Sequence, residues 1–344
     1  MLSRGSLFTV CCLVCCTASL LAGAQERQGR QGGRGRGAQA QEPAKPPATD
    51  KVTPEIPGVA KAGTKIEIVA FGLQGSDAGV GMPDGSFIAT GNGGVIKIDT
   101  NGKMTTLVED SEQAAGLAMD PKGRLIGAQY TKKVSVLYPK GSEETLTASF
   151  DGKPYIRPND LVADKKGGVY FTDQLGIFAD GIGPGVYYVK PDGHTIKISA
   201  DISRPSGIML SPDEKTLYVT DSVGTFIKTF DVQPDGNARN ERNFAEAYER
   251  RPTHSLADGL AVDAAGRLYA ATYLGVLVFS PKGEQLGRIR IPRQPVNLAF
   301  AGPDKKTLYV LGAILGLRDA DSQPEFGSVY KIPMLAEGYK GRAK

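Results

Sequence analysis

Several residue types that often build catalytic or stabilising sites are scarce in this 344-residue chain. Tryptophan is absent, and the four cysteines all lie before residue 17. If that start is removed on export, no cysteine remains, and disulfides contribute nothing to the stability of the protein. Only two histidines occur, His194 and His254. This scarcity argues against a zinc centre and against an electron-transfer or quinone-dependent sugar dehydrogenase, for which clustered histidines would be expected.

The first 57 residues differ in composition from the rest of the chain. Residues 1–24 combine Arg4, an apolar stretch over residues 7–21 and a final Ala-Gly-Ala, which predicts a cleaved secretory signal peptide. Residues 25–57 are rich in Gln, Gly, Arg and Pro and predict a disordered linker. An Arg-Gly arm for nucleic acid is the alternative, but export favours a flexible tether. We therefore expect a secreted or periplasmic protein.

An excess of one charge is also lacking beyond the linker. From Gly58 onward the chain carries 34 basic and 33 acidic residues. A body so close to neutral offers no electrostatic footprint for nucleic acid or anionic lipid. We expect a monomer that binds a small molecule, with no nucleic-acid partner and no membrane contact beyond the signal peptide.

Long helical periodicity is absent, and a short β-type pattern recurs six times instead. One copy is LADGLAVDAAGRLYAAT at residues 256–272, where two apolar runs flank a turn. Each repeat has four strand-like runs, which is typical of a propeller blade. The last repeat lacks its fourth run, and residues 64–71 (TKIEIVAF) can supply it. The sequence predicts an all-β fold: a six-bladed β-propeller of four-stranded antiparallel blades at residues 58–336, closed by this N-terminal strand, with a C-terminal tail at 337–344.

One position in each repeat forms a ring when the six inner strands face a central channel. Two carboxylates, two amides, a hydroxyl and a methyl group hold this position: Asp77, Asp258, Asn159, Asn297, Ser206 and Ala115. Oxygen donors without histidine or thiolate suit a hard cation, and Ca²⁺ accepts about six to eight flexible oxygen ligands. The alternative is a polar channel that holds only water. No EF-hand pattern occurs, so the prediction of a metal depends on the ring.

Four segments carry further recognisable motifs: R-P-N-D at residues 157–160, P-S-G-I-x-L-S-P-D-E-K-T-L-Y-V-T-D at 205–221, A-D-G-L-A-V-D-x-x-G-x-L-Y at 257–269 and F-A-G-P-D-K-K-T-L-Y-V at 300–310. Together they resemble the gluconolactonase, SMP-30 and regucalcin-like family. The resemblance covers about residues 65–334. It implies a six-bladed propeller with a divalent cation in the channel and an enzyme that hydrolyses sugar lactones, while some relatives cleave organophosphates.

The resemblance also implies roles for individual residues. The expected cation ligands, for Ca²⁺ or another divalent ion, are Asp77, Asn159, Ser206 and Asp258. Asp258 and Arg157 would be catalytic, Asp258 as general base and Arg157 by orienting a sugar oxygen or carboxylate. Arg157 and Asn159 would also bind substrate. Two departures weaken the ligand set: Asp77 stands where the family usually has Glu, and Ser206 stands where it usually has Asn.

Other candidates end the second strands or lie in loops near the predicted channel mouth. Tyr130 and Tyr273 are candidate pocket walls, and we assign Tyr273 to substrate binding. Asp173 and Asp221 would either bond to backbone at the mouth or assist the site. His254 precedes Asp258 by four residues and is a candidate base, although a solvated loop position is the simpler interpretation.

The combined prediction is a secreted, calcium-dependent hydrolase of a sugar lactone, in which water attacks a metal-polarised carbonyl. The alternative is a non-catalytic propeller that binds a ligand or a protein and holds a structural cation. The methyl group of Ala115 and the weak ligand Ser206 leave room for this second interpretation.

Overall fold

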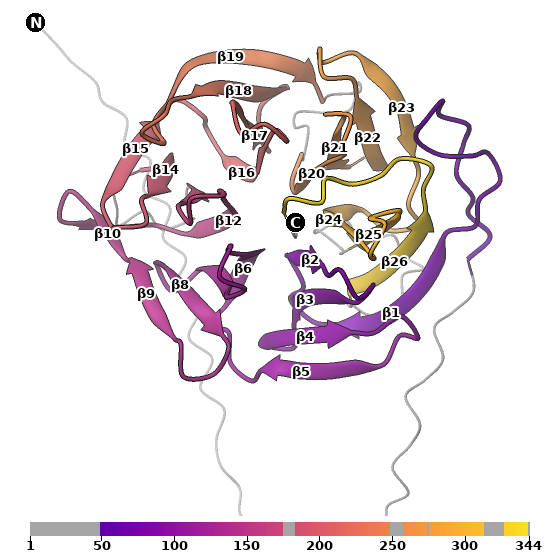
Figure 1. Cartoon of the computed structure of the whole chain (residues 1–344), viewed down its shortest axis with the longest axis horizontal. Helices are drawn as coiled ribbons and strands as arrows, with labels where there is room; N and C mark the ends of the chain where they lie inside the picture. Colours follow the sequence, from indigo (N-terminus) through magenta and orange to yellow (C-terminus); the bar gives the residue numbers. More distant parts are fainter. Residues whose placement is uncertain (1–48, 175–182, 248–256, 274, 313–326, 343–344) are drawn as a thin grey trace, which may run out of the picture. The chain divides into compact units, whose positions relative to one another are not determined.

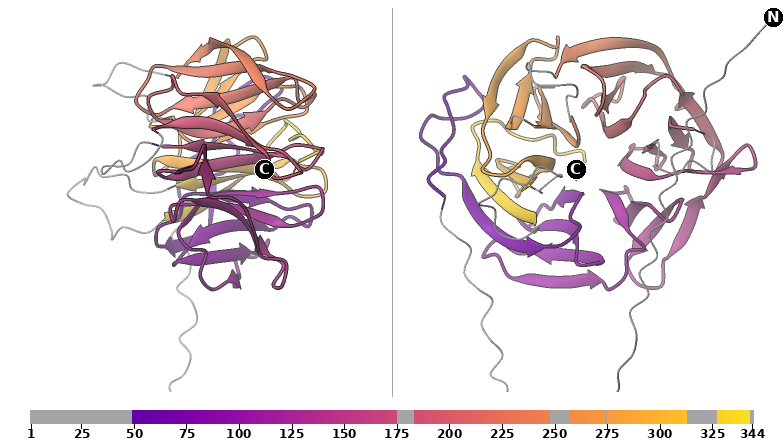
Figure 2. Two further views of the ribbon diagram at one scale, coloured as in Figure 1. Left: turned by 90° about the vertical axis from the view of Figure 1, so that its left-hand side faces the viewer. Right: turned by 180° about the vertical axis from the view of Figure 1, so that it is seen from behind.

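The structure is a computed structural model that describes residues 49–174, 183–247, 257–273, 275–312 and 327–342. Six four-stranded antiparallel sheets are arranged as blades around a central axis (Figure 1). Two further views show the same stack of sheets from the side and the same ring from behind (Figure 2). Among the described residues no helix is long and apolar enough to cross a membrane. The predicted all-β, six-bladed propeller is confirmed.

The first three blades follow one another along the chain, each running outward from its inner strand. Blade 1 consists of β2 Gly79–Gly81, β3 Phe87–Gly91, β4 Gly94–Ile98 and β5 Met104–Val108. Blade 2 consists of β6 Ala114–Met119, β7 Leu125–Gln129, β8 Lys133–Tyr138 and β9 Glu144–Thr147. A hairpin follows, made of β10 Ser149–Phe150 and β11 Lys153–Pro154. Blade 3 consists of β12 Pro158–Ala163, β13 Val169–Asp173, β14 Gly185–Val189 and β15 Thr195–Ser199.

The next two blades repeat this order, and the last one borrows a strand. Blade 4 consists of β16 Pro205–Leu210, β17 Thr216–Asp221, β18 Phe226–Val232 and β19 Ala238–Glu246. Blade 5 consists of β20 Leu260–Val262, β21 Leu268–Thr272, β22 Gly275–Phe279 and β23 Gln285–Ile289. Blade 6 consists of β24 Pro295–Ala301, β25 Thr307–Gly312, β26 Gly327–Pro333 and β1 Glu67–Leu73.

Blade 6 closes the ring by combining strands from both ends of the propeller. β1 runs antiparallel to β26, with Glu67 opposite Lys331 and Leu73 opposite Gly327. The N-terminal strand is therefore the outer strand of the last blade, as predicted from residues 64–71. This pairing satisfies backbone groups that would otherwise form an open sheet edge.

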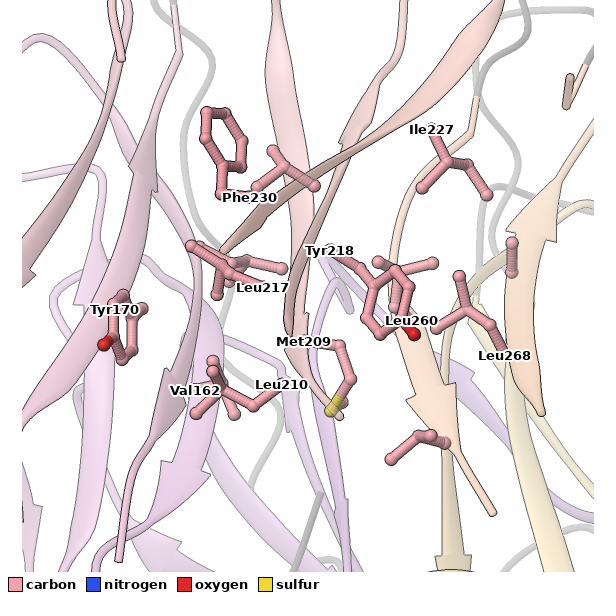
Figure 3. Close-up of a cluster of buried hydrophobic side chains, with 14 of the residues drawn as sticks. Val162, Tyr170, Met209, Leu210, Leu217, Tyr218, Ile227, Phe230, Leu260 and Leu268 are labelled. Carbon is pink, nitrogen blue, oxygen red and sulfur yellow. The ribbon is translucent and has the colours of Figure 1, made fainter. Parts of the chain in front are cut away.

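The core consists of apolar layers between adjacent blades. Figure 3 shows one layer, in which side chains of blades 3, 4 and 5 meet. Val162, Leu217 and Leu260 come from these three blades, and all three are fully buried. Burying a side chain of this size stabilises the fold by ~1.5–3 kcal/mol. Each blade needs such a layer on both faces, which a closed ring provides.

The two ends of the described chain pack against the propeller. Ile56, which the sequence places in the linker, is buried and accepts a backbone hydrogen bond from Ala60. The C-terminal segment, yellow in Figure 1, runs from β26 toward the centre of the ring. Its Arg342 donates to the carbonyl of Leu210 (3.0 Å) and pairs with Glu214 (2.9 Å). The predicted signal peptide and residues 25–48 of the predicted linker lie outside the described residues.

The buried side chain of Lys305 links blade 1 to blade 6 through hydrogen bonds to backbone carbonyls. Its side chain is 4% exposed, and Nζ donates to the carbonyl oxygens of Gly81 in β2 and Phe300 in β24, both at 3.0 Å. Because burial disfavours the charged form, the pKa of Lys305 is lowered to about 8.

Lys305 should make stability rise with pH between about pH 8 and 10.5. In this window the unfolded chain holds the lysine proton and the folded protein does not, so raising the pH favours folding. Below pH 8 both states are protonated and the cost of burying the charge is present in full. We expect the unfolding free energy of the wild type, measured against Lys305→Met, to gain up to about 3 kcal/mol across the window. A constant difference in denaturant titrations at pH 8, 9 and 10.5 would contradict this prediction.

Candidate active site

The predicted ring residues lie at or just before the starts of the inner strands. Asp77 lies two residues before β2 of blade 1, and Asp258 lies two residues before β20 of blade 5. Ala115, Asn159 and Ser206 are each the second residue of an inner strand, in β6, β12 and β16. The C-terminal segment contacts the opposite ends of β12 and β16, through Ala163 and Leu210. The ring therefore occupies one end of the channel and the C-terminal segment the other.

A series of hydrogen-bonding contacts links the two acids of the ring. The Tyr130 hydroxyl donates to Asp77 Oδ2 (2.8 Å) and accepts from Asn159 Nδ2 (3.2 Å). The Ser206 hydroxyl lies 3.1 Å from Asn159 Oδ1 and 2.7 Å from Asp258 Oδ1, and it can donate to one of them at a time. Four of the six predicted positions are thus connected across blades 1, 3, 4 and 5. We call the five residues Asp77, Tyr130, Asn159, Ser206 and Asp258 the channel chain.

Tyr130 supplies the oxygen that blade 2 lacks at its own ring position. Ala115 contributes only a methyl group, and Tyr130 reaches the ring from the end of β7 in the same blade. The Arg157 guanidinium lies over the Tyr130 ring, 3.7 Å from its centroid, as a cation–π contact. Sequence reasoning treated Tyr130 as a pocket wall, and the structure adds its hydroxyl to the ring.

Small residues beside the ring allow neighbouring blades to approach closely. A Cβ added to Gly207 would lie 2.0 Å from the carbonyl oxygen of Asp258, so no side chain fits there. The Thr220 hydroxyl accepts from the Gly207 N–H (2.7 Å) and donates to the same Asp258 carbonyl (3.1 Å). Thr172 makes the equivalent bridge from blade 3 to the carbonyl of Ser206 (2.6 Å). These contacts fix the spacing of the ring residues.

The two acids are held in an environment that disfavours their ionised forms. Burial raises the pKa of Asp258 well above its usual range, and the neighbouring Asp77 carboxylate raises it further. Burial also raises the pKa of Asp77, while the Tyr130 hydrogen bond and the positive charge of Arg157 act in the opposite direction. Burial raises the pKa of Tyr130, so its hydroxyl remains a donor at neutral pH. Two converging carboxylates that repel each other form a site that a cation would stabilise.

The donor set fits a hard cation. Among the described residues no three His, Cys, Asp or Glu side chains gather as a metal-binding group. The channel chain instead offers two carboxylates, one amide oxygen and a serine hydroxyl, with Asn159 Oδ1 and Asp258 Oδ1 both in reach of Ser206. Oxygen ligands of mixed charge are the kind that Ca²⁺ binds in proteins. Asp77, Asn159, Ser206 and Asp258 are the residues that could hold such an ion.

Comparison with known proteins agrees with this arrangement and decides the family. The sequence profile of the SMP-30/gluconolactonase/LRE-like region matches residues 92–314. The chain belongs to the SMP-30/gluconolactonase family. A gluconolactonase of Zymomonas mobilis is 28% identical over 292 residues, which cover 76% of this chain and 82% of that protein.

Solved structures of other SMP-30/gluconolactonase proteins share the fold. A gluconolactonase from Xanthomonas campestris has a TM-score of 0.68 at 23% identity, covering 86% of this chain and 99% of that one. Regucalcin from Agrobacterium tumefaciens, described as a calcium-binding protein, has a TM-score of 0.63 at 20% identity, covering 76% and 91%. At these identities the likeness concerns the fold alone.

The remaining predicted residues have different positions in this SMP-30/gluconolactonase chain. Asn297 is buried, but its Oδ1 accepts from the backbone N–H of Leu298 (2.9 Å) rather than from the channel chain. Tyr273 is 44% exposed after β21, and its assignment to substrate binding stays a prediction. His254 lies outside the described residues. Sequence reasoning missed Gln174, whose Nε2 donates to Ser206 Oγ (3.0 Å).

Asp173 and Asp221 bond to backbone at the mouth, in agreement with the first of the two predicted roles. Asp173 accepts the N–H groups of Ile156 (2.9 Å) and Arg157 (2.6 Å), and Asp221 accepts that of Arg204 (3.1 Å). Burial raises the pKa of Asp173 to about 6. Both carboxylates therefore hold the backbone immediately before a ring residue.

Tyr130 should determine which end of the Asn159 amide would face a cation bound at the ring. The Tyr130 hydroxyl donates its single proton to Asp77, so it can only accept a hydrogen bond from Asn159. The NH₂ group of Asn159 therefore faces Tyr130, and its amide oxygen faces Ser206. We expect Tyr130→Phe to weaken Ca²⁺ binding about tenfold, because a partner that orients a ligand typically contributes this much affinity. Calorimetric titration of the metal-free protein measures the effect without any turnover.

Two further variants separate orientation from general damage. In Asn159→Asp the carboxylate has two equivalent oxygens, so adding Tyr130→Phe should cost less affinity than it does in the wild type. Tyr170→Phe removes a hydroxyl that donates to Gly236 in the core (2.7 Å), and it should leave Ca²⁺ affinity unchanged. Equal losses from Tyr130→Phe in the two backgrounds would show that Tyr130 does not orient Asn159.

Proposed function

We propose that this protein is an exported, calcium-dependent hydrolase of a sugar lactone. The observation that carries the proposal is the channel chain, which brings Asp77 and Asp258 together in a chain of the SMP-30/gluconolactonase family. The gluconolactonase of Zymomonas mobilis, with 82% of its length covered, supports lactone hydrolysis as the activity. The predicted signal peptide at residues 1–24 supports export to the periplasm or the exterior.

Asp77, Asn159, Ser206 and Asp258 would hold the cation. A bound divalent ion would offset the repulsion between the two carboxylates and would supply Lewis-acid polarisation of a carbonyl oxygen. Calcium is the best match because the oxygen ligands are mixed in type and one of them is a weak serine hydroxyl.

Hydrolysis requires a proton acceptor for the attacking water. The oxygen of water bonds to the lactone carbonyl carbon, and the ring C–O bond breaks to give an open-chain hydroxy acid. Asp258 would take the proton from the water and return it to the ring oxygen as that oxygen leaves. The Ser206 hydroxyl, 2.7 Å from Asp258 Oδ1, orients this carboxylate.

Substrate orientation falls to the residues around the channel mouth. Arg157 lies over Tyr130 with its guanidinium next to the channel chain, where it would contact a sugar oxygen or carboxylate. Asn159 would bind the substrate through the same amide that faces the ion. Tyr273, partly exposed beyond β21, would contact the sugar from the loop side. We propose that the partner is a small lactone and that the protein binds it as a monomer.

Removal of the cation or of Asp258 should abolish turnover. We expect EDTA-treated protein to hydrolyse D-glucono-δ-lactone at the uncatalysed rate and Ca²⁺ to restore activity. Asp258→Asn should lower kcat/KM by about a hundredfold or more with Ca²⁺ present, because it removes the proton acceptor and one ligand charge. A pH-indicator assay of acid release measures both effects.

Asp192→Asn serves as the matched control for this experiment. Asp192 lies in an exposed turn, where it accepts a hydrogen bond from the nearby His194 N–H, so its loss should not affect turnover. Retention of activity by Asp258→Asn in calcium-free buffer would contradict the proposal. Tight Ca²⁺ binding without turnover of any lactone in a panel would favour the alternative, a non-catalytic binding propeller with a structural cation.

A further inference from the structure

Two neighbouring blades hold an arginine at the channel mouth in the same way. Arg157 and Arg204 each stand two residues before a ring residue and are followed by a proline. The N–H of Arg157 donates to Asp173 (2.6 Å), and that of Arg204 donates to Asp221 (3.1 Å). Pro158 pairs with Asp173 and Pro205 with Asp221 in the strand register.

The backbone carbonyls complete this equivalence. Arg157 O accepts from Gln174 N (3.1 Å), and Arg204 O accepts from Ser222 N (3.0 Å). Each arginine is therefore fixed on both sides by the residues that end the second strand of its blade. Because blades 3 and 4 are adjacent, the two side chains start from matching positions at the same end of the channel.

The two guanidinium groups lie near the charges of Asp77 and Asp258 but are not hydrogen-bonded to either carboxylate among the described residues. Both arginines are half-buried, and within the described part of the chain neither makes an ion pair or a side-chain hydrogen bond. Arg204 Nε is buried and has no hydrogen-bond partner in the described part of the chain. Arg157 has the Tyr130 ring on one face, which attracts the charge and leaves its N–H groups free at the edge. Asp173 and Asp221 end the strands that pair with Pro158 and Pro205, the residues after the two arginines. Their carboxylates accept the backbone N–H groups of Arg157 and Arg204.

Unused guanidinium donors in a half-buried site indicate a missing acceptor. A buried donor without a partner costs free energy, which a ligand that supplies an oxygen would recover. The planar fork of arginine matches the two oxygens of a carboxylate or a phosphate, and such bidentate contacts are about twice as strong as neutral ones. A sugar hydroxyl satisfies one N–H group, whereas an oxyanion can bridge two arginines.

We propose that Arg157 and Arg204 together bind an anionic group, a carboxylate or a phosphate, carried by the lactone substrate. The substrate class is then acidic sugar lactones rather than neutral ones. This inference rests on the proposed lactonase function, since it concerns the same channel mouth. Arg204 becomes a specificity residue that the sequence motifs did not single out.

The activity arm of the test compares three lactones on the calcium-loaded enzyme. D-Glucono-δ-lactone is neutral, its 6-phosphate carries a phosphate, and D-glucaro-1,4-lactone carries a carboxylate. We expect kcat/KM for one of the two acidic lactones to exceed that of the neutral one about tenfold or more, and the better acid identifies the anionic group. In Arg204→Gln this ratio should fall toward one. Arg204→Lys keeps the charge but loses the planar guanidinium, so its ratio should lie between those of the wild type and Arg204→Gln.

Arg242→Gln is the matched control, because it removes the same charge from an exposed arginine that pairs with Asp231 (2.6 Å). It should leave the ratio unchanged. A wild-type ratio near one, with all three lactones hydrolysed, would overturn the acidic substrate class and leave the lactonase proposal intact. An unchanged ratio in Arg204→Gln would also overturn the role of the arginine pair. The preference for an acidic lactone would then come from the bound cation or from the overall charge of the protein.

A binding arm keeps the test decisive if no lactone is hydrolysed. Absence of turnover would remove the lactonase proposal, but calorimetry with glucose, glucose 6-phosphate and glucuronate still measures anion preference. We expect one of the two acids to bind at least about tenfold more tightly than glucose to the wild type, and this advantage to be lost in Arg204→Gln. Equal affinities of the wild type for all three sugars would show that the arginine pair does not bind an oxyanion.

Discussion

The site depends on holding two carboxylates, Asp77 and Asp258, in one channel. Each loses hydration there, and their like charges repel, so both are shifted toward the protonated form. Tyr130, Asn159 and Ser206 connect the acids through hydrogen bonds but add no charge that would neutralise them. The repulsion is tolerated because blade packing fixes the backbone at both positions. A site of this kind gains stability from any cation that can reach it.

The same contacts that build the propeller set the dimensions of the site. Thr220 bridges blade 4 to the carbonyl of Asp258, and Gly207 lets that carbonyl approach where a Cβ would collide. A change at either residue would alter blade packing and ring geometry together. Fold stability and the spacing of the candidate ligands therefore cannot be separated in this architecture.

The repeat pattern predicted the fold and the ring register, because one residue in each inner strand must face the axis. Strand counting also predicted closure by β1, since the last blade lacked a strand. The role of Tyr130 could not be predicted, because it lies outside the repeated register and reaches the ring only where Ala115 is small. The turn of Asn297 toward Leu298 likewise depends on a side-chain rotation that no pattern encodes. The repeated Arg-Pro before Asn159 and Ser206 was visible, but its meaning required the bonds from Asp173 and Asp221.

The two ends of the channel treat buried cations differently, and this contrast bears on function. At the end covered by the C-terminal segment, Arg342 pairs with Glu214 and donates to backbone carbonyls, and Lys305 donates to two carbonyls. The fold therefore supplies acceptors where a buried cation only has a structural role. At the ring end, Arg204 Nε has none among the described residues. Two uncharged groups among the described residues, the Tyr187 hydroxyl and Gln294 Nε2, also lack a partner. Arg204 differs from them because it is a cation, and it lies at the mouth beside the two acids, where a substrate would enter and provide the missing oxygen.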